Sequence, residues 1–402
     1  MIDAARLWQR LMALAEIGDS GDGGVNRQAL TAGEISAWRL LIGWAEAAGM
    51  QAATDAAGNL FLTRPGRNPA LPPLLLGSHI DTQPTGGKFD GAFGVLAALE
   101  AAMVLPPPAR DVTVVAWMNE EGSRFAPGMI GSEAFAGVRP LAEIRAARDA
   151  AGISVGEALD ALHAAFPTLP HRPLGFPAHA YLEPHIEQGP LLEQAGAVIG
   201  VVTGIQGKTT WEMVVQGEEG HAGTLDLALR RDALARFAAI AHAMHQAAAA
   251  SDPALKFTIG HVRVEPNAPS VVPGRVVFRI DLRHPENALL DSFGETLEAL
   301  ARQHAPPCGV AIRRMVAAPS NLFDAGLQAR IAAAAQALGV PVMPILSAAG
   351  HDARHMAPRC PSAMIFIPCR GGISHAPQEW AEPAHVAAGA AVLAQVAAEL
   401  VA

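Results

Sequence analysis

The stretches LPPLLLGSHID at residues 71–81 and DVTVVAWMNEEG at residues 111–122 decide the fold of this chain. Both contain near-continuous apolar runs that end in polar residues, which is typical of strands buried on both faces of a parallel sheet. Residues 90–103 between them are rich in Ala and Leu and predict a helix. A strand, a helix and a second strand, with polar residues after each strand, indicate an open α/β sheet with a site along one edge.

The same pattern extends on both sides of this unit. Residues 1–50 predict two amphipathic helices, and residues 180–187 predict a further buried strand. Residues 325–338, the apolar run 362–368 and an Ala-rich terminal helix continue the pattern. We therefore expect one domain built from residues 1–207 and 321–402, of class α/β, with a mixed, mostly parallel sheet flanked by helices; the candidate metal-binding and catalytic residues described below make it the expected catalytic domain.

The pattern changes after Gly207. Residues 209–215 alternate like a half-buried strand, and further strands and two helices follow up to residue 304. Helices interleaved with alternating strands predict a smaller inserted α+β domain at 208–320, with two layers and a ferredoxin-like arrangement. A role for this insert as a lid or dimerisation domain is only implied by the resemblance described below.

Composition narrows the class of protein. The chain has 402 residues, too many for one compact core, and 50% of them are hydrophobic. A formal net charge of −9 argues against nucleic acid or an anionic membrane as partner. The three cysteines show no framework spacing, which predicts reduced thiols and a cytoplasmic location. No apolar stretch reaches the ~18–20 uninterrupted residues of a membrane span.

Metal-ligand residue types occur at the predicted strand ends. In an extended segment His79 and Asp81 share one face, so that His79 can bind a metal while Asp81 orients its ring. Asp90 lies among small residues in GGKFDG, and its two oxygens allow it to bridge two ions. The alternative for the His-x-Asp pair is a surface turn with an ordinary ion pair.

Glu120 and Glu121 close the second apolar strand. Adjacent carboxylates repel unless cations neutralise them, so one is expected to bind metal while the other faces a water molecule. The alternative is a solvated loop with two free acids. His185 and His375 follow apolar segments in the same way, and each alone is more often a structural residue than a ligand. The prediction of a metal pair therefore rests on all these positions occurring together.

The motifs resemble those of the hydantoinase/carbamoylase amidohydrolases. That family includes N-carbamoyl-L-amino acid hydrolase, allantoate amidohydrolase and β-ureidopropionase, and is related to the aminoacylases and di-zinc exopeptidases. The match runs in order along nearly the whole chain. The motifs are GSHIDT (77–82), GGKFDG (86–91), NEEGSRF (119–125), GSEAFAG (131–137), HIEQGP (185–190), GHAGT (220–224), AGHDA (349–353) and GISHAPQE (372–379).

The resemblance implies a role for each site residue. Two divalent metal ions, most simply Zn but also Mn, Co or Ni, would share the bridging Asp90. His79 and His185 would complete one set of ligands, and Glu121 and His375 the other. Glu120 would act as the general base for a water molecule that bridges the metals and serves as nucleophile, and Asp81 would support His79.

Further residues would contact the substrate. By resemblance, His221 would steady the oxyanion, in some relatives from the partner subunit, Arg283 would bind the substrate carboxylate and Gln188 the ureido group. A turn histidine without a role is the alternative for His221, and an ion pair with Asp281 is the alternative for Arg283. Ser270 stands where the family usually has Asn, and Asn267 is a candidate to replace that amide.

These observations predict an amidohydrolase that acts on N-carbamoyl-L-amino acids or related ureido acids, and a homodimer is implied by resemblance alone. An allantoate or ureidoglycolate amidohydrolase, or an aminoacylase-like amide hydrolase, is the alternative within the same class. A catalytically silent relative would lack Glu120 or a ligand, and this chain lacks none. A structural zinc protein is disfavoured because the chain has no cysteine cluster.

Overall fold

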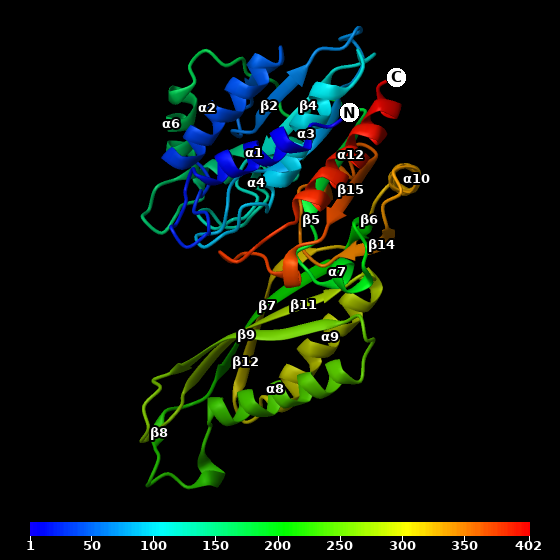
Figure 1. The fold of residues 1–402 in the computed structure, drawn as a ribbon. Coiled ribbons are helices and arrows are strands. Elements are labelled where there is room, and N and C mark those ends of the chain that lie inside the picture. The colour runs from blue at the N-terminus through cyan, green and yellow to red at the C-terminus, as the bar shows by residue number, and fades with distance from the viewer. The chain divides into compact units, whose positions relative to one another are not determined.

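The computed structural model describes all residues from Met1 to Ala402 and divides them into two compact units. Unit 1 comprises Met1–Gly204 and Leu322–Ala402, and unit 2 comprises Ile205–Asn321 (Figure 1). The division proposed from the sequence was 208–320. Each unit is described by itself.

Unit 1 is organised around a nine-stranded sheet of order β1-β2-β4-β3-β5-β15-β6-β13, with β14 paired to β6. Its strands are β1 (Gln51–Thr54), β2 (Leu60–Arg64), β3 (Leu74–His79), β4 (Val112–Trp117), β5 (Ala180–Ile186), β6 (Ile199–Ile205), β13 (Asn321–Leu322), β14 (Val342–Ser347) and β15 (Ser362–Ile367). Its helices are α1 (Ala4–Ala15), α2 (Ala32–Ala47), α3 (Ala92–Val104), α4 (Ile130–Ala136), α5 (Leu141–Ala146), α6 (Val155–Ala165), α7 (Leu191–Ala195), α10 (Ala325–Ala337), α11 (Ala353–Met356) and α12 (Pro383–Leu400), with the 3-10 turn η2 (Arg370–Gly372).

The expected mixed α/β class is confirmed, and the sheet contains both parallel and antiparallel pairs. Strands β4, β3, β5 and β15 are parallel neighbours. β1 and β2 form an antiparallel hairpin beside β4, and β6 runs antiparallel to β15. Antiparallel strands need only short connections, whereas each parallel pair needs a crossover. The apolar runs detected in the sequence correspond to these central strands, which are buried on both faces.

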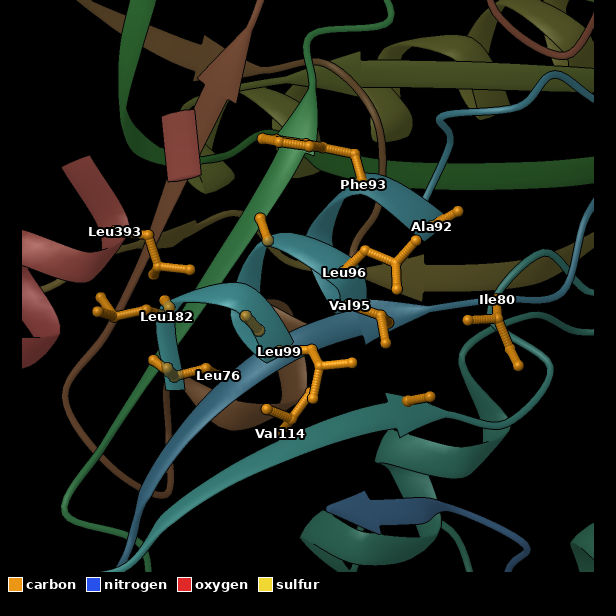
Figure 2. Packing of buried hydrophobic residues seen from close by; sticks show 14 of the residues in the cluster. Leu76, Ile80, Ala92, Phe93, Val95, Leu96, Leu99, Val114, Leu182 and Leu393 are labelled. Carbon is orange, nitrogen blue, oxygen red and sulfur yellow. The ribbon is translucent and has the colours of Figure 1, made fainter. Parts of the chain in front are cut away.

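Helix α3 packs against the central strands and forms the middle of the core (Figure 2). Its residues Ala92–Ala102 are all buried, because it lies against β3 on one side and against α1 and α12 on others. In Figure 2, Leu99 lies close to Val114 of β4, and Leu76 of β3 lies close to Leu182 of β5. Burying each such leucine contributes about 1.5–3 kcal/mol, so the strand ends beside α3 rest on a well-packed support.

Helix α12 is long and apolar enough to cross a membrane by length and composition alone. Here it packs on α3 and α10, and Val386, Leu393 and Val396 are buried in the core of unit 1. Its apolar character is therefore accounted for by packing inside the domain.

Unit 2 has a four-stranded antiparallel sheet of order β12-β7-β11-β9, covered on one face by α8 and α9 (Figure 1). A two-stranded ribbon, β8 with β10, extends from one end. The elements are β7 (Gly207–Gln216), β8 (Gly220–His221), η1 (Leu227–Leu229), α8 (Ala233–Ala249), β9 (Lys256–Glu265), β10 (Val271–Val272), β11 (Arg275–His284), α9 (Asn287–His304) and β12 (Gly309–Ala318).

Candidate metal centre and active site

The parallel strands of unit 1 bring their carboxyl ends to one edge of the sheet. His79 is the last residue of β3, Glu120 and Glu121 follow β4, and His185 lies near the end of β5. His375 comes from the loop after β15, the next strand along. Because adjacent parallel strands end on the same side, residues far apart in the sequence meet there.

Asp90 is the centre of this cluster. Its Oδ1 lies 3.7 Å from His79 Nε2 and 3.1 Å from His185 Nε2. Its Oδ2 lies 3.2 Å from His375 Nε2, which is 3.3 Å from Glu121 Oε2. The donor atoms of His79, Asp90 and His185 form one compact group, and those of Asp90, Glu121 and His375 form a second, with all atoms of each group within 4.8 Å of one another.

The orientation of the imidazoles fits metal binding. His79 Nδ1 contacts the main-chain oxygen of Asp81 at 3.0 Å, and His185 Nδ1 contacts that of Ile186 at 2.8 Å. A carbonyl accepts a hydrogen bond from Nδ1–H, which leaves the lone pair on each Nε2 next to the Asp90 carboxylate; the Nε2 of His185 also accepts the N–H of Gly91 at 3.2 Å. Two electron-rich groups face each other stably only when a proton or cation lies between them. Ligating histidines in metal sites are held in this way.

Glycine is required next to Asp90. Gly91 has a φ of +62°, and a Cβ built there would lie 2.4 Å from Cε1 of His79. Only a residue without a side chain allows the Asp90 loop to approach the histidine ring this closely. The small residues noted around Asp90 in the sequence thus have a direct steric function.

The sequence predicted that the Asp81 side chain orients the ring of His79, and the structure shows a different set of contacts. The ring of His79 is hydrogen bonded to the main chain of Asp81, while the Asp81 carboxylate lies 3.7 Å from Nδ1. That carboxylate instead accepts hydrogen bonds from the backbone N–H groups of Glu120 (3.1 Å) and Glu121 (3.2 Å). Asp81 therefore holds the turn that carries both acids, because two N–H groups end on one buried carboxylate.

Glu120 and Glu121 diverge from this turn. Glu120 Oε2 lies 3.6 Å from His79 Nε2, and Glu121 accepts hydrogen bonds from the backbone and side chain of Gln83. Burial raises the pKa of Glu120 well above its ordinary value, opposed by His79, and the carboxylates of Asp352 and Glu121 raise it further. Burial, followed by Asp90, raises the pKa of Glu121 to about 7. So many buried carboxylates in one place create the negative potential that divalent cations relieve.

The pKa values of two imidazoles in the cluster are raised by the carboxylates around them. Although burial opposes it, Glu120, Asp90 and Asp81 raise the pKa of His79 well above 6.5. The hydrogen bond to Asp90 raises the pKa of His375 to about 9. Burial alone would raise the pKa of Asp90, but its contacts with the three histidines lower that pKa well below 3.8. A negative carboxylate facing several imidazoles is a charge distribution that suits metal binding.

Glu379 and Glu183 are among the buried acids of this site that were not assigned a role from the sequence. Glu379 Oε1 accepts hydrogen bonds from the N–H groups of Phe89 and Asp90, and its Oε2 accepts one from Ser374. Glu183 accepts hydrogen bonds from Ser78 and from the backbone of Ala353. A signal for Glu379 was present, since it is the last residue of GISHAPQE (372–379). Glu183 had no such signal, because it lies inside the buried strand β5.

Gln188 lies within the second ligand group. Its Nε2 is 2.9 Å from Asp90 Oδ2 and 3.3 Å from His375 Nε2. Both Gln188 and His375 have positive φ values, 57° and 54°, which non-glycine residues rarely adopt and which cluster at functional sites. The amide proposed to contact substrate thus adjoins the ligands.

The remaining predicted residues lie in unit 2 and do not all come together. His221 pairs with Val271 across the β8–β10 ribbon, and the next residue after His221 donates its N–H to the oxygen of Ser270 at 3.0 Å. Asn267 lies in the same loop and is exposed, as are His221 and Ser270. Arg283 is at the opposite end of the sheet, paired in register with Lys208, and its guanidinium contacts Asp281 at 2.8 and 3.2 Å.

Comparison with known proteins identifies the family. Residues 75–399 match Peptidase family M20/M25/M40. The chain belongs to this family. The expected resemblance and the assignment to the hydrolases are thereby confirmed.

Several similar proteins match nearly the whole chain. N-carbamoyl-L-amino-acid amidohydrolase of Rhizobium meliloti is 40% identical over 399 residues, covering 98% of this chain and 95% of the relative. Allantoate amidohydrolase of Bacillus subtilis is 34% identical, covering 91% and 90%. The crystal structure of an amidase of the hydantoinase/carbamoylase family from Burkholderia multivorans is 38% identical, with a TM-score of 0.90 and coverage of 100% and 98%.

Proposed function

We propose that this protein is a binuclear-metal amidohydrolase that cleaves a non-peptide C–N bond in N-carbamoyl-L-amino acids or related ureido acids. The observation that carries the proposal is the pair of ligand groups sharing Asp90, with the carboxylate of Glu120 beside them. The names of the family relatives support the substrate class.

The proposed ligands are five side chains of unit 1. His79, Asp90 and His185 would hold one ion, and Asp90, Glu121 and His375 the other. Imidazoles and carboxylates suit Zn, which we propose, and also Mn, Co or Ni. When bound, such a pair polarises the scissile carbonyl and lowers the pKa of coordinated water toward ~7.

Glu120 is the proposed general base. Its carboxylate accepts a proton from the attacking water, whose oxygen forms a bond to the ureido carbon. The protonated Glu120 then donates this proton to the nitrogen whose bond to that carbon breaks. The amino acid leaves with the electron pair of that bond, and the remaining carbamic acid, which keeps the second proton of the water, decomposes to carbon dioxide and ammonia. Asp81 supports these steps because its carboxylate holds the N–H groups of Glu120 and Glu121.

The geometry of unit 2 supports a homodimer. Arg283 pairs with Lys208, whereas His221 lies beyond Gln216 at the other end of the sheet (Figure 1). Eight residues of strand separate these ends by roughly 26 Å. One substrate cannot contact Arg283 and His221 of the same unit 2, so we propose that His221, Asn267 and Ser270 act on the substrate held by a second copy.

Arg283 is the proposed ligand of the substrate carboxylate. Its present contact with Asp281 also fits the alternative of a structural ion pair. To bind substrate, the guanidinium of Arg283 would have to exchange the carboxylate of Asp281 for that of the substrate. Gln188 is proposed to contact the ureido group. The three cysteines are free and buried, which supports a cytoplasmic location.

An allantoate or ureidoglycolate amidohydrolase is the second candidate, because the Bacillus subtilis relative carries the name allantoate amidohydrolase. An aminoacylase-like amide hydrolase is a third. The substitution of Ser270 for the usual Asn bears on the choice, since a hydroxyl offers fewer hydrogen bonds than an amide.

A screen of ammonia release tests these proposals. The protein is stripped with a chelator, reloaded with Zn, Mn, Co or Ni, and assayed on N-carbamoyl-L-amino acids, their D-enantiomers, allantoate, ureidoglycolate and an N-acetyl amino acid, the last by release of the free amine. We expect the metal-free protein to be inactive but folded, and an N-carbamoyl-L-amino acid to give the highest kcat/KM. Full activity after chelation would overturn the metal mechanism, and a preference for allantoate or N-acetyl substrates would establish the corresponding alternative.

A further inference from the structure

Residues 25–30 of the N-terminal segment, here called the strap, connect the two turns that carry the catalytic centre. The N–H of Val25 donates to the oxygen of Gly86, and the oxygen of Arg27 accepts from the N–H of Thr82. On the other side, Gln28 contacts Ser123 at 3.3 Å. Arg124 donates to the oxygens of Ala29 (3.0 Å) and Leu30 (2.7 Å). The strap therefore bonds to residues 82–86 and 123–124, although no sequence motif of the site includes it.

Arg27 is the anchor of the strap. Its side chain is buried, and its Nε donates to the oxygen of Ile80 at 2.8 Å. Its Nη1 donates to the oxygens of Leu14 (2.8 Å) and Ile17 (2.9 Å). Burial lowers the pKa of Arg27 to about 10, so the guanidinium stays charged at neutral pH. A buried carbonyl that loses its donor has no water to replace it, so these bonds resist displacement.

Ile80 stands between the two residues that organise the centre. The ring of His79 is held by the main-chain oxygen of Asp81, and the Asp81 carboxylate holds the turn of Glu120. A rotation of the peptide at Ile80 would move both. The hydrogen bond from Arg27 to the Ile80 oxygen opposes that rotation.

We propose that Arg27 is a positioning residue of the catalytic centre, which acts by fixing the Ile80 carbonyl and thereby the ring of His79 and the carboxylate of Asp81. This inference rests on the function proposed for the Asp90 site. Removing such a support of a ligand typically weakens metal affinity about 10- to 100-fold.

The test compares Arg27→Met and Arg27→Lys with Arg64→Met. Arg64 is a matched control, because its Nη1 also donates to two main-chain oxygens, those of Ala102 (2.6 Å) and Leu105 (2.7 Å), and it contacts neither turn. Zinc affinity is measured without substrate by competition with a chromogenic chelator. The melting temperature, kcat and KM are measured in parallel.

For Arg27→Met we expect zinc affinity and kcat each to fall about 10- to 100-fold, with KM nearly unchanged. Arg27→Lys, which keeps the charge and one donor, should recover part of both. Arg64→Met should lower only the melting temperature. If Arg27→Met does not fold, Arg27→Lys decides, and wild-type zinc affinity in that variant overturns the proposal.

Three further outcomes show whether this inference, the proposed function or both fail. Equal losses of zinc affinity in Arg27→Met and Arg64→Met would show a general effect of destabilisation and overturn the role of Arg27. A wild-type protein that binds zinc but releases no ammonia would overturn the proposed function, while the comparison of zinc affinities would still decide the role of Arg27. A wild-type protein that binds no divalent metal would overturn both.

Discussion

Asp81→Asn is expected to slow turnover about 100-fold while leaving KM nearly unchanged. The two carboxylate oxygens of Asp81 each accept one backbone N–H, from Glu120 at 3.1 Å and from Glu121 at 3.2 Å. Asparagine has nearly the same shape but only one acceptor oxygen. In either orientation of its amide, one of the two N–H groups faces another donor.

The size of the effect follows from burial, since the Asp81 side chain is inaccessible to solvent. The variant loses a hydrogen bond to a charged group, worth about 1.5–3 kcal/mol, and leaves a buried donor unpaired at a cost of about 1–3 kcal/mol. The turn is expected to relieve this strain by moving. A displacement of Glu120 on the order of 1 Å costs about 100-fold in rate.

Asp55→Asn provides the matched control for stability. Asp55 is equally buried and accepts hydrogen bonds from the backbone N–H groups of Ala57 and Asn59, but none of these residues belongs to the site. Both variants should lower the free energy of urea unfolding, and only Asp81→Asn should lower kcat for ammonia release. Wild-type kcat in Asp81→Asn, or an equal fall of kcat in both variants, would refute the positioning argument.

Three further predictions use the same assays. Glu120→Gln should lower kcat about 1,000-fold while the metal content, measured by atomic emission, stays at the wild-type level; near-normal turnover would contradict its role as base. Arg283→Ala should raise KM for carboxylate substrates about 30-fold, or ~2 kcal/mol. If the wild-type protein hydrolyses the matching amides equally well, Arg283 does not bind the substrate carboxylate. Burial lowers the pKa of His355 from 6.5 to about 4. The unfolded state therefore binds more protons between these values, and the free energy of unfolding should fall by about 2 kcal/mol from about pH 7.5 to about pH 5. His355→Gln should remove most of this dependence, and an unchanged dependence would mean that other groups cause it.

The strands that the sequence predicted best are the central strands of unit 1, which are buried on both faces. The segments that form β3, β4, β5 and β15 are buried over their whole length and are largely apolar, so composition indicated them. Burial was not sufficient, because β2 and β6 are also buried along most of their length and were not predicted. Two other strands that were not predicted are of a different kind. β12 is exposed along much of its length, and β1 is a short strand at the edge of the sheet. Such strands owe their pairing to neighbours that no local pattern reveals.

By itself the sequence determined which residue types stand at the ends of apolar strands, and those residues carried the family, now confirmed, and the hydrolase class. Only the tertiary structure decided which atoms meet: three imidazoles around Asp90, the Asp81 carboxylate on the Glu120 turn, and Arg27 behind Ile80. The reason is that a strand end is set by local composition, whereas a hydrogen bond between distant residues depends on how strands are ordered and packed. The separation of Arg283 from His221 is a result of the second kind, because it depends on the antiparallel register of β7 and β11.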